Sequence, residues 1–308
     1  MNSIQLTELI KERAYELGFS LVGICDTEPL LDEEDKLRSW ISSGYHYKLK
    51  WLEDSVIVRT NPKELLPNAK SIIVLGINFY NKVKYLEDKN IGKISRYAII
   101  KDYHTVIKEK QELLSNYIKI FIPNANLKYF CDASPMLEKR LGQKAGLGWQ
   151  GKNSILITKK YGSFVFLAAM ITDIELVFDK SEIDQCKKCD RCVNECPTGA
   201  IVDPYKIDVK KCIAYWTTIF KGTEIPIEFK GKFQNWVYGC DACQDVCPYN
   251  KDLEVTKDQS FISILEPNLD LIKYNNISER EFNAFFCETP IMQIKRKDLS
   301  KNIQFLIE

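Results

Sequence analysis

Hydrophobic and polar residues alternate in patterns that predict helices and strands in succession over the first 175 residues. Near the N-terminus, apolar side chains recur at helical spacing at Leu6, Leu9, Ile10, Ala14 and Leu17. Helices are predicted over residues 4–17, 30–43, 102–120 and 134–145. Strands are predicted over 19–25, 71–80 and 127–131, and a hairpin over 155–160 and 163–172.

This order of elements predicts an α+β protein with three consecutive segments. Residues 1–175 are expected to form a mixed α/β domain, because helices alternate with strands there. Residues 176–255 hold most of the cysteines and are expected to form a ferredoxin-like module. Residues 256–308 read as a short, polar, helical C-terminal segment.

Composition narrows the class of protein further. The chain has 308 residues, of which 45% are hydrophobic and 28% charged, and this is ordinary for a soluble globular protein. The formal charge of +1 neither favours nor excludes a nucleic-acid partner. No apolar run reaches the roughly 18 residues of a membrane helix, and the charged, amphipathic start does not resemble a signal peptide. We therefore expect a cytoplasmic protein with no membrane partner.

Eleven cysteines in such a chain indicate metal ligands or reactive thiols, because disulfides are rare in a reducing compartment. The first group is Cys186-x2-Cys189-x2-Cys192-x3-Cys196-Pro197. This spacing is the bacterial ferredoxin run, in which the fourth cysteine ligates the other of two [4Fe–4S] clusters.

The second group, Cys240-x2-Cys243-x3-Cys247-Pro248, lacks the first cysteine of such a run, which would fall at Val237. Because a cluster needs four ligands, Cys212 is the economical replacement. A crossed arrangement then assigns Cys186, Cys189, Cys192 and Cys247 to cluster one. It assigns Cys196, Cys212, Cys240 and Cys243 to cluster two.

Structural zinc is the alternative, since zinc sites also use C-x2-C pairs. Zinc does not require a third cysteine at the same spacing followed by Cys-Pro, so the pattern favours clusters. Cys25, Cys131 and Cys287 are left over and read as small buried residues.

A second candidate site lies in the segment from Cys131 to Asp173. Asp132 ends a predicted strand before a predicted helix, where it is either a helix N-cap or a functional carboxyl. The glycines between Gly146 and Gly151 allow a backbone to approach a large ligand closely. Their G-x-G-x-x-G spacing follows a helix and not a strand, so it does not indicate a dinucleotide site.

This segment and the cysteine order resemble the epoxyqueuosine reductases, cobalamin-dependent enzymes of queuosine synthesis in tRNA. Other stretches that carry the resemblance are Arg59-x2-Pro62-x2-Leu65-x-Pro67, Ser95-Arg96-Tyr97-Ala98, Asp102-Tyr103-His104 and Cys196-Pro197-Thr198-Gly199-Ala200. The resemblance runs over the whole chain and implies a cobalamin-binding domain beside the two-cluster module.

The resemblance also implies an oxidoreductase mechanism. The epoxide of epoxyqueuosine, at the wobble position of tRNA, is reduced to the alkene of queuosine by cob(I)alamin generated through the two clusters. Asp132 matches the family's proton donor, and burial is expected to raise its pKa so that it stays protonated. The candidate cobalamin contacts are Arg59, Lys152, Asn153, Ser154 and Ser163.

The expected partners are a tRNA anticodon loop carrying epoxyqueuosine and an external low-potential electron donor, with the protein acting as a monomer. The chain departs from the family at Ile100-Lys101, where a Gly-Arg-like pair is usual, and it is expected to be a short form without a C-terminal helical-repeat domain. Two alternatives are a cobalamin-dependent reductase of a small molecule, such as a dehalogenase, and a non-catalytic electron-transfer or corrinoid-reactivating protein.

Overall fold

The computed structural model describes residues 2–132 and 135–307. The chain divides into two compact units, each assembled from two separate stretches of sequence. Unit 1 comprises Met1–Asn78 and His104–Cys189, and unit 2 comprises Phe79–Tyr103 and Asp190–Glu308. The expected boundaries near residues 175 and 255 differ from this division, because residues 79–103 leave the first segment to pack with the C-terminal half.

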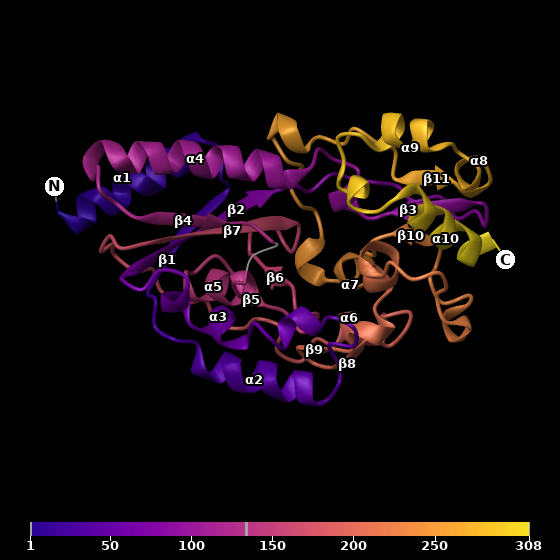
Figure 1. Ribbon diagram of the computed structural model, residues 1–308, viewed down its shortest axis with the longest axis horizontal. Coiled ribbons are helices and arrows are strands. Elements are labelled where there is room, and N and C mark those ends of the chain that lie inside the picture. The colour runs from indigo at the N-terminus through magenta and orange to yellow at the C-terminus, as the bar shows by residue number, and fades with distance from the viewer. Residues whose placement is uncertain (1, 133–134, 308) are drawn as a thin grey trace. The chain divides into compact units, whose positions relative to one another are not determined.

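A four-stranded antiparallel sheet forms the centre of unit 1 (Figure 1). Its strands, in spatial order, are β1 (Leu21–Cys25), β2 (Ser71–Asn78), β7 (Val165–Thr172) and β4 (Leu127–Phe130). All eight residues of β2 are buried, as expected for an inner strand covered on both faces. This sheet confirms the strands predicted over 19–25, 71–80 and 127–131.

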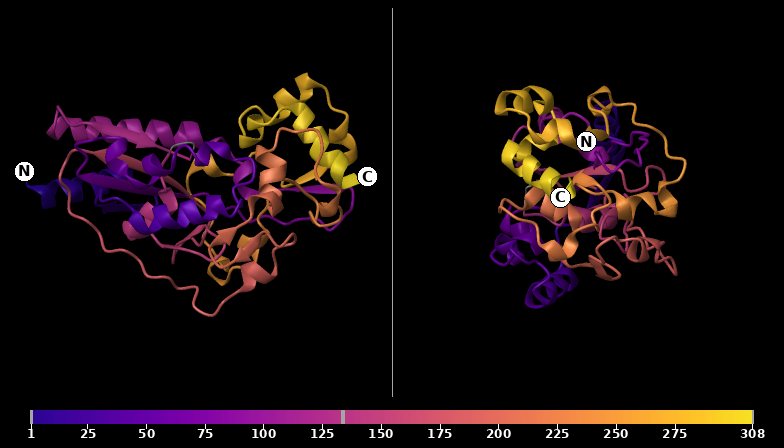
Figure 2. Two further views of the ribbon diagram at one scale, coloured as in Figure 1. Left: turned by 60° about the horizontal axis from the view of Figure 1, so that its bottom comes forward. Right: turned by 90° about the vertical axis from the view of Figure 1, so that its right-hand side faces the viewer.

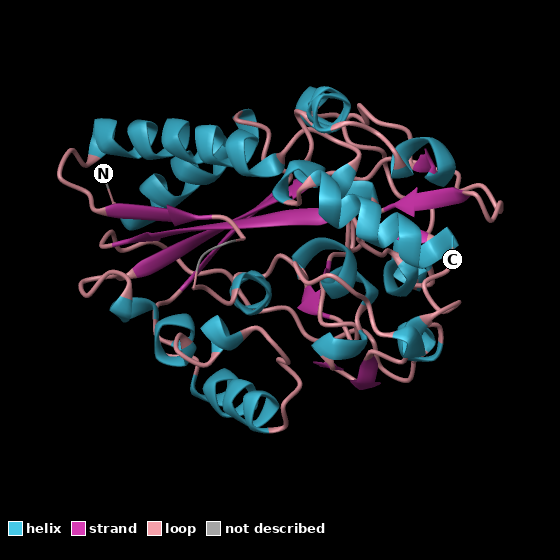
Figure 3. Ribbon diagram, turned by 45° about the vertical axis from the view of Figure 1, so that its right-hand side comes forward, coloured by secondary structure: helices cyan, strands magenta, loops and turns pink. Residues whose placement is uncertain are grey.

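Helices cover both faces of this sheet, as Figures 1 and 3 show. On one side lie α1 (Ser3–Glu16) and α4 (Tyr103–Phe121), and on the other lie α2 (Leu31–Ser42), α3 (Val56–Thr60) and α5 (Glu138–Lys144). The face toward α5 forms a core with Ile72, Val74, Leu141 and Ile171. Successive strand residues point to opposite faces, so Ile73 and Leu75 are buried on the side of α1 and α4.

Two predicted elements differ from those observed. The hairpin expected from 155–160 and 163–172 does not form, because β6 (Leu156–Ile157) pairs with β5 (Trp149–Gln150) and β7 is shared between β2 and β4. A single bridge between Thr158 and Gly162 is what remains of the expected turn. The helix predicted over 134–145 begins at Glu138, and residues 133–134 lie outside the described part.

The last part of unit 1 is an extended connection over residues 173–189, without helix or strand, seen as the long loop in Figure 2. It is anchored first at Asp179, which forms an ion pair with Lys11 (2.6 Å) and accepts a hydrogen bond from the Ile24 N–H (2.8 Å). It is anchored again where the Glu182 N–H donates to the Gln143 carbonyl (3.1 Å). These contacts fix the approach to Cys186.

Unit 2 contains a small mixed sheet in which β3 (Ile91–Ile94) is the middle strand. Strand β10 (Trp236–Tyr238) pairs with β3 in parallel, and β11 (Asn268–Asp270) pairs with it antiparallel. The other regular elements of this unit are α6 (Arg191–Asn194), β8 (Ile201–Asp203), β9 (Lys206–Ile207), α7 (Ala242–Asp245), α8 (Leu271–Asn275), α9 (Glu279–Phe286) and α10 (Arg296–Ile307).

The C-terminal segment is more than the polar helical tail expected from its composition. It supplies β11 to the sheet and buries Leu271, Phe286 and Leu299. The buried Asn302 amide donates to the Thr217 carbonyl (2.9 Å) and the Val237 carbonyl (3.0 Å). Residues 256–308 therefore form part of the core of unit 2.

Candidate active site and cluster ligands

Asp132 stands just beyond the end of β4, in the left-handed region of backbone conformation (φ 55°). Aspartate tolerates this region better than most non-glycine residues. Its backbone N–H donates a 2.9 Å hydrogen bond to Glu138 Oε1, at the start of α5. The residue that precedes α5 is Leu137, so Asp132 is not the cap of this helix.

The Asp132 carboxyl is exposed, contrary to the expectation of burial. Its side chain is 62% accessible, and its Oδ2 lies 3.5 Å from His104 Nε2 in the first turn of α4. His104 belongs to one of the stretches that carry the family resemblance, and its contact with Asp132 was not predicted.

Glu138, next to Asp132, is a carboxyl whose pKa is shifted from its ordinary value. Burial, followed by the charge of Asp132, raises its pKa to about 7, although the Asp132 N–H, Lys139 and His104 act in the opposite direction. Arg59 on α3 is also electrostatically coupled to Glu138. The Arg59 guanidinium donates to Ser55 Oγ (2.8 Å) and lies over the Trp51 ring at 4.9 Å.

The predicted cofactor contacts around residue 152 lie in a tight turn between β5 and β6. Lys152, Asn153 and Ser163 are buried, and Ser154 has a positive φ of 61°. The Asn153 side-chain oxygen accepts a hydrogen bond from the Ile155 N–H (3.3 Å), and the amide nitrogen of the same side chain is buried. Among the described residues, this buried nitrogen has no hydrogen-bond partner.

Two glycines that precede β5 approach the chain's own backbone closely. A Cβ on Gly148 would lie 2.1 Å from the Ile157 carbonyl oxygen, and one on Gly146 would lie 2.6 Å from the Lys180 carbonyl oxygen. The close approach that they permit is therefore to the chain's own backbone, and it fixes the turn against β6 and the extended connection.

Cys186 lies against this same turn within unit 1. Burial raises the pKa of its thiol, and hydrogen bonding by the Lys152 backbone and the Trp149 indole lowers it. Trp149 is completely buried, so its indole is held in place. A predicted ligand of cluster one thus contacts the loop that bears the predicted cofactor contacts.

In unit 2, thiols predicted to bind cluster two influence one another's pKa. The pKa of the Cys243 thiol is raised well above its ordinary value, first by burial and then by Cys212 and Cys196. Cys240 shows the same direction, with burial as the main cause and Cys243 and Cys212 as contributors. Such a set of thiols suits a cluster, because bound iron replaces the protons and relieves their mutual repulsion.

Within the described residues, no three His, Cys, Asp or Glu side chains are arranged to hold a single metal ion. The spacing of the cysteines along the chain is what favours clusters over zinc.

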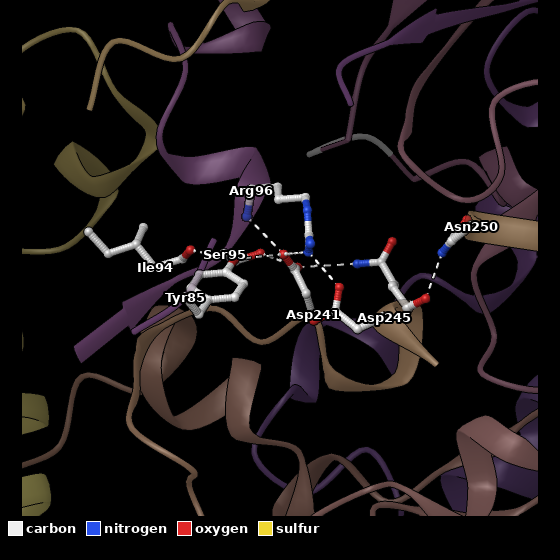
Figure 4. A network of polar contacts seen from close by, with 8 residues as sticks. Tyr85, Ile94, Ser95, Arg96, Asp241, Asp245 and Asn250 are labelled. Carbon is white, nitrogen blue, oxygen red and sulfur yellow. Dashed lines mark hydrogen bonds and ion pairs between the residues drawn. The ribbon is translucent and has the colours of Figure 1, made fainter. Parts of the chain in front are cut away.

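A buried polar network holds the loop between Cys240 and Cys243 (Figure 4). Asp241 accepts hydrogen bonds from the Ser95 hydroxyl, from the Arg96 N–H (2.9 Å) and from the Arg96 guanidinium (3.0 Å). Arg96 also contacts Asp245 (2.6 Å), and the Tyr85 hydroxyl donates to the Ile94 carbonyl (2.9 Å). The segment around β3 thereby positions the loop of two predicted cluster ligands, which lie more than a hundred residues later in the chain.

The three leftover cysteines occupy different environments. No cysteine among the described residues forms a disulfide bond. Burial raises the pKa of Cys25 to about 12, so this thiol is inert. Cys131 is partly buried and its thiol contacts the Leu167 carbonyl (3.6 Å), whereas Cys287 is exposed.

The fold and this donor set define a two-cluster iron–sulfur oxidoreductase. The family model of a 4Fe-4S double cluster binding domain matches residues 185–250, and the model of epoxyqueuosine reductase QueG, DUF1730, matches residues 59–133. An epoxyqueuosine reductase of Cyclobacterium marinum is 39% identical over 303 residues, which cover 97% of this chain and 96% of that protein. The chain belongs to the epoxyqueuosine reductase family.

Solved structures agree with this assignment. An epoxyqueuosine reductase with an epoxyqueuosine-modified tRNA-Tyr stem loop has a TM-score of 0.93 and 32% identity, covering 99% of this chain and 82% of that one. The Bacillus subtilis enzyme, described with an aspartate catalytic loop swung out of the active site, gives a TM-score of 0.87 and 31% identity over 99% of this chain and 82% of that one. These matches confirm the predicted α+β class and the cluster module.

No helix in the part of the chain that the structure describes has the length and apolar character needed to cross a membrane.

Proposed function

We propose that this chain reduces epoxyqueuosine to queuosine in the anticodon loop of tRNA, with Asp132 as the group that delivers a proton to the substrate oxygen. The observation that carries the assignment of Asp132 is its position: an exposed carboxyl at a strand end, flanked by His104 and Glu138. An exposed carboxyl is accessible to a nucleotide that arrives on a large RNA. The relatives' stem-loop complex and aspartate catalytic loop support the same assignment.

The reaction sets the requirements that the residues must meet. Converting an epoxide to an alkene breaks both C–O bonds, forms a C=C bond and releases the oxygen as water. Two electrons and two protons are consumed. A positioned acid is needed when the first C–O bond breaks, because an alkoxide is a poor product in the absence of a proton donor.

Cobalamin is the cofactor that we assign to the loop between β5 and β6. When bound, it supplies a strongly reducing, nucleophilic cobalt centre. The buried Asn153 amide nitrogen, a donor without a partner among the described residues, suits the amide oxygens on the rim of a corrin. Lys152, Ser154, Ser163 and Arg59 are the other groups that we propose to hold it.

The cluster ligands give the route by which electrons reach this loop. We assign cluster one to Cys186, Cys189, Cys192 and Cys247, and cluster two to Cys196, Cys212, Cys240 and Cys243. Cys186 contacts the loop at Lys152 and Trp149, so cluster one is the proposed immediate donor. An external low-potential donor in the cytoplasm is proposed to reduce the clusters, and the protein to act as a monomer.

Asp132→Asn tests the central assignment. The variant should retain its iron and its fold but lose about 10²-fold or more in kcat, because the amide cannot supply a proton. The measurement is queuosine formed in a modified stem loop by anaerobic protein with reduced clusters and added cobalamin. Asp35→Asn, at an exposed position on α2, is the matched control and should turn over like wild type. Wild-type rates for Asp132→Asn would remove the assignment.

A further inference from the structure

The proposed reaction consumes two protons, and one aspartate carries only one. The first proton goes to the alkoxide that forms when one C–O bond breaks. The second goes to the oxygen that leaves as the other C–O bond breaks and the C=C bond forms. Asp132 must therefore be reprotonated within a turnover, or a second acid must stand beside it.

Asp132 by itself is also poorly suited to hold a proton before substrate arrives. Its side chain is 62% accessible, and a carboxyl in water ionises well below neutral pH. The neighbouring Glu138 has the opposite character, because it is partly buried and its pKa is raised to about 7. Burial and the charge of Asp132 thus favour the protonated form of Glu138.

The geometry connects the two groups. Glu138 Oε1 accepts the Asp132 backbone N–H at 2.9 Å, and the charge of Asp132 is the strongest electrostatic influence that raises the pKa of Glu138. The backbone hydrogen bond holds the two residues side by side, and the charge of Asp132 acts on the protonation of Glu138.

We propose that Glu138 stores the proton that Asp132 delivers, and that it reloads Asp132 for the second C–O cleavage. This inference rests on the proposed function and assigns the source of protons for the same site. When substrate covers Asp132, loss of water raises the proton affinity of its carboxyl, and the proton moves from Glu138 to Asp132. Glu138 acts through Asp132 and does not touch the substrate.

The groups that face Glu138 come from three other places in unit 1. Asp132, after β4, raises its pKa, and His104 on α4 lowers it, as does Lys139 on α5 itself. Arg59 on α3 is coupled to the same carboxyl. His104 is the rival proton source, because it lies 3.5 Å from Asp132 Oδ2.

Glu138→Gln separates proton storage from structure. The amide oxygen still accepts the Asp132 N–H, so the loop keeps its anchor, but the side chain can no longer carry a proton. Wild-type kcat, measured in single turnovers with reduced protein, should fall as the pH rises through about 7, where Glu138 loses its proton. The variant should be about tenfold slower at pH 6, and its rate should not change across this pH range.

Three outcomes decide the proposal. A Glu138→Gln protein with the wild-type rate and pH profile would reduce Glu138 to an anchor. A transition that persists in Glu138→Gln but disappears in His104→Asn would place the proton on His104. No turnover by the wild-type protein would instead refute the proposed function. The role of Glu138 is tested only by comparing the rate of the variant with that of an active wild-type protein.

A second measurement needs neither substrate nor cobalamin. In full-length protein labelled with ¹³C at the glutamate carboxyls, one resonance should titrate near pH 7, and it should be missing in Glu138→Gln. Asp132→Asn should lower that midpoint, because the variant removes a negative charge that raises the pKa of Glu138. Glu12→Gln, exposed on α1, should leave the resonance in place. A spectrum with no glutamate midpoint above about 6 would overturn the proposal.

Discussion

At the scale of single residues, accessibility and a raised pKa are found on two neighbouring carboxyls. A catalytic acid usually needs both properties. Asp132 is accessible to a large substrate, whereas Glu138 is the carboxyl whose pKa is raised by burial. A fully exposed carboxyl would be ionised at neutral pH, and a fully buried one would not reach a nucleotide on tRNA. The hydrogen bond from the Asp132 backbone N–H to Glu138 Oε1 keeps the two residues adjacent.

Cys212 provides the clearest residue-scale test of the cluster assignment. It stands outside both cysteine runs, yet it is close enough to Cys240 and Cys243 to raise the pKa of each. Cys212→Ala should lower iron from about eight atoms per chain toward four, because cluster two loses a ligand. Cys25→Ala is the control and should keep its iron, since Cys25 is buried beside β2 and α5 and far from neutral-pH ionisation. Full iron in Cys212→Ala, measured by metal analysis and absorbance, would contradict the crossed assignment.

At the scale of elements, close packing against a strand positions α5 in unit 1 and the loop of Cys240 and Cys243 in unit 2. In unit 1, Gly23 in β1 faces the Ala145 carbonyl at the end of α5, and a Cβ there would lie only 2.0 Å from that oxygen. The helix that begins with Glu138 is thereby held against the sheet. In unit 2, the chain segment at β3 holds the loop of Cys240 and Cys243 through Arg96.

Gly23→Ala should therefore destabilise unit 1 by about 1–3 kcal/mol, the usual cost of overpacking a core. The matched variant is Gly142→Ala within α5, where a Cβ would lie 3.1 Å from the movable Cδ2 of Leu156. That substitution also gains helix propensity, so its effect on stability should be small or favourable. The free energy of unfolding in urea measures both, and equal values would show that α5 does not pack closely on β1.

Arg96→Met tests the network in unit 2. The substitution leaves the Asp241 carboxylate buried without its cation, and removal of one partner of a buried ion pair costs about 3–5 kcal/mol. Because Asp241 lies between Cys240 and Cys243, we expect cluster two to be lost and iron to fall toward about four atoms per chain. Arg296→Met removes a partly exposed arginine 3.5 Å from Glu279 and should keep all of its iron. Retention of both clusters by Arg96→Met would show that the cysteines alone fix this loop.

At the scale of the whole molecule, the proposed substrate is part of a tRNA, and recognition rests on the loop that carries the modified nucleotide. Unstacked loop bases are the usual target of sequence-specific RNA recognition. A related enzyme has been solved with a modified stem loop, and this supports the stem loop as a sufficient substrate here. The chain's overall charge of +1 supplies little long-range attraction for a polyanion.

A modified stem loop should therefore be turned over with a kcat/KM within about tenfold of that for whole tRNA, a difference of about 1.4 kcal/mol. The salt dependence of both should be shallow, because few phosphates are neutralised. The measurement is kcat/KM for each substrate at two salt concentrations. A large preference for whole tRNA that disappears steeply with added salt would indicate an extended phosphate-binding surface instead.

The local patterns of the sequence determined most elements of unit 1 and the presence of a double-cluster domain. Helical spacing predicted α1 and α4, and the apolar runs predicted β1, β2 and β4, because side-chain periodicity follows from backbone geometry. Cysteine spacing predicted the double-cluster domain, since the positions of thiolates along the chain are constrained by the cluster that they bind. The predicted hairpin of 155–160 with 163–172 was wrong, because strand pairing depends on partners distant in sequence.

Only the tertiary structure decided which residues share an environment. It placed residues 79–103 with the C-terminal half, brought Arg96 to Asp241, and set Cys186 against the loop of Lys152. It also left Asp132 exposed and raised the pKa of Glu138, six residues further along. Burial and electrostatic coupling depend on which groups surround a side chain in space, and no local pattern encodes them. The sequence therefore determined which chemical groups are present, and the fold decided which of them lie together and which are buried.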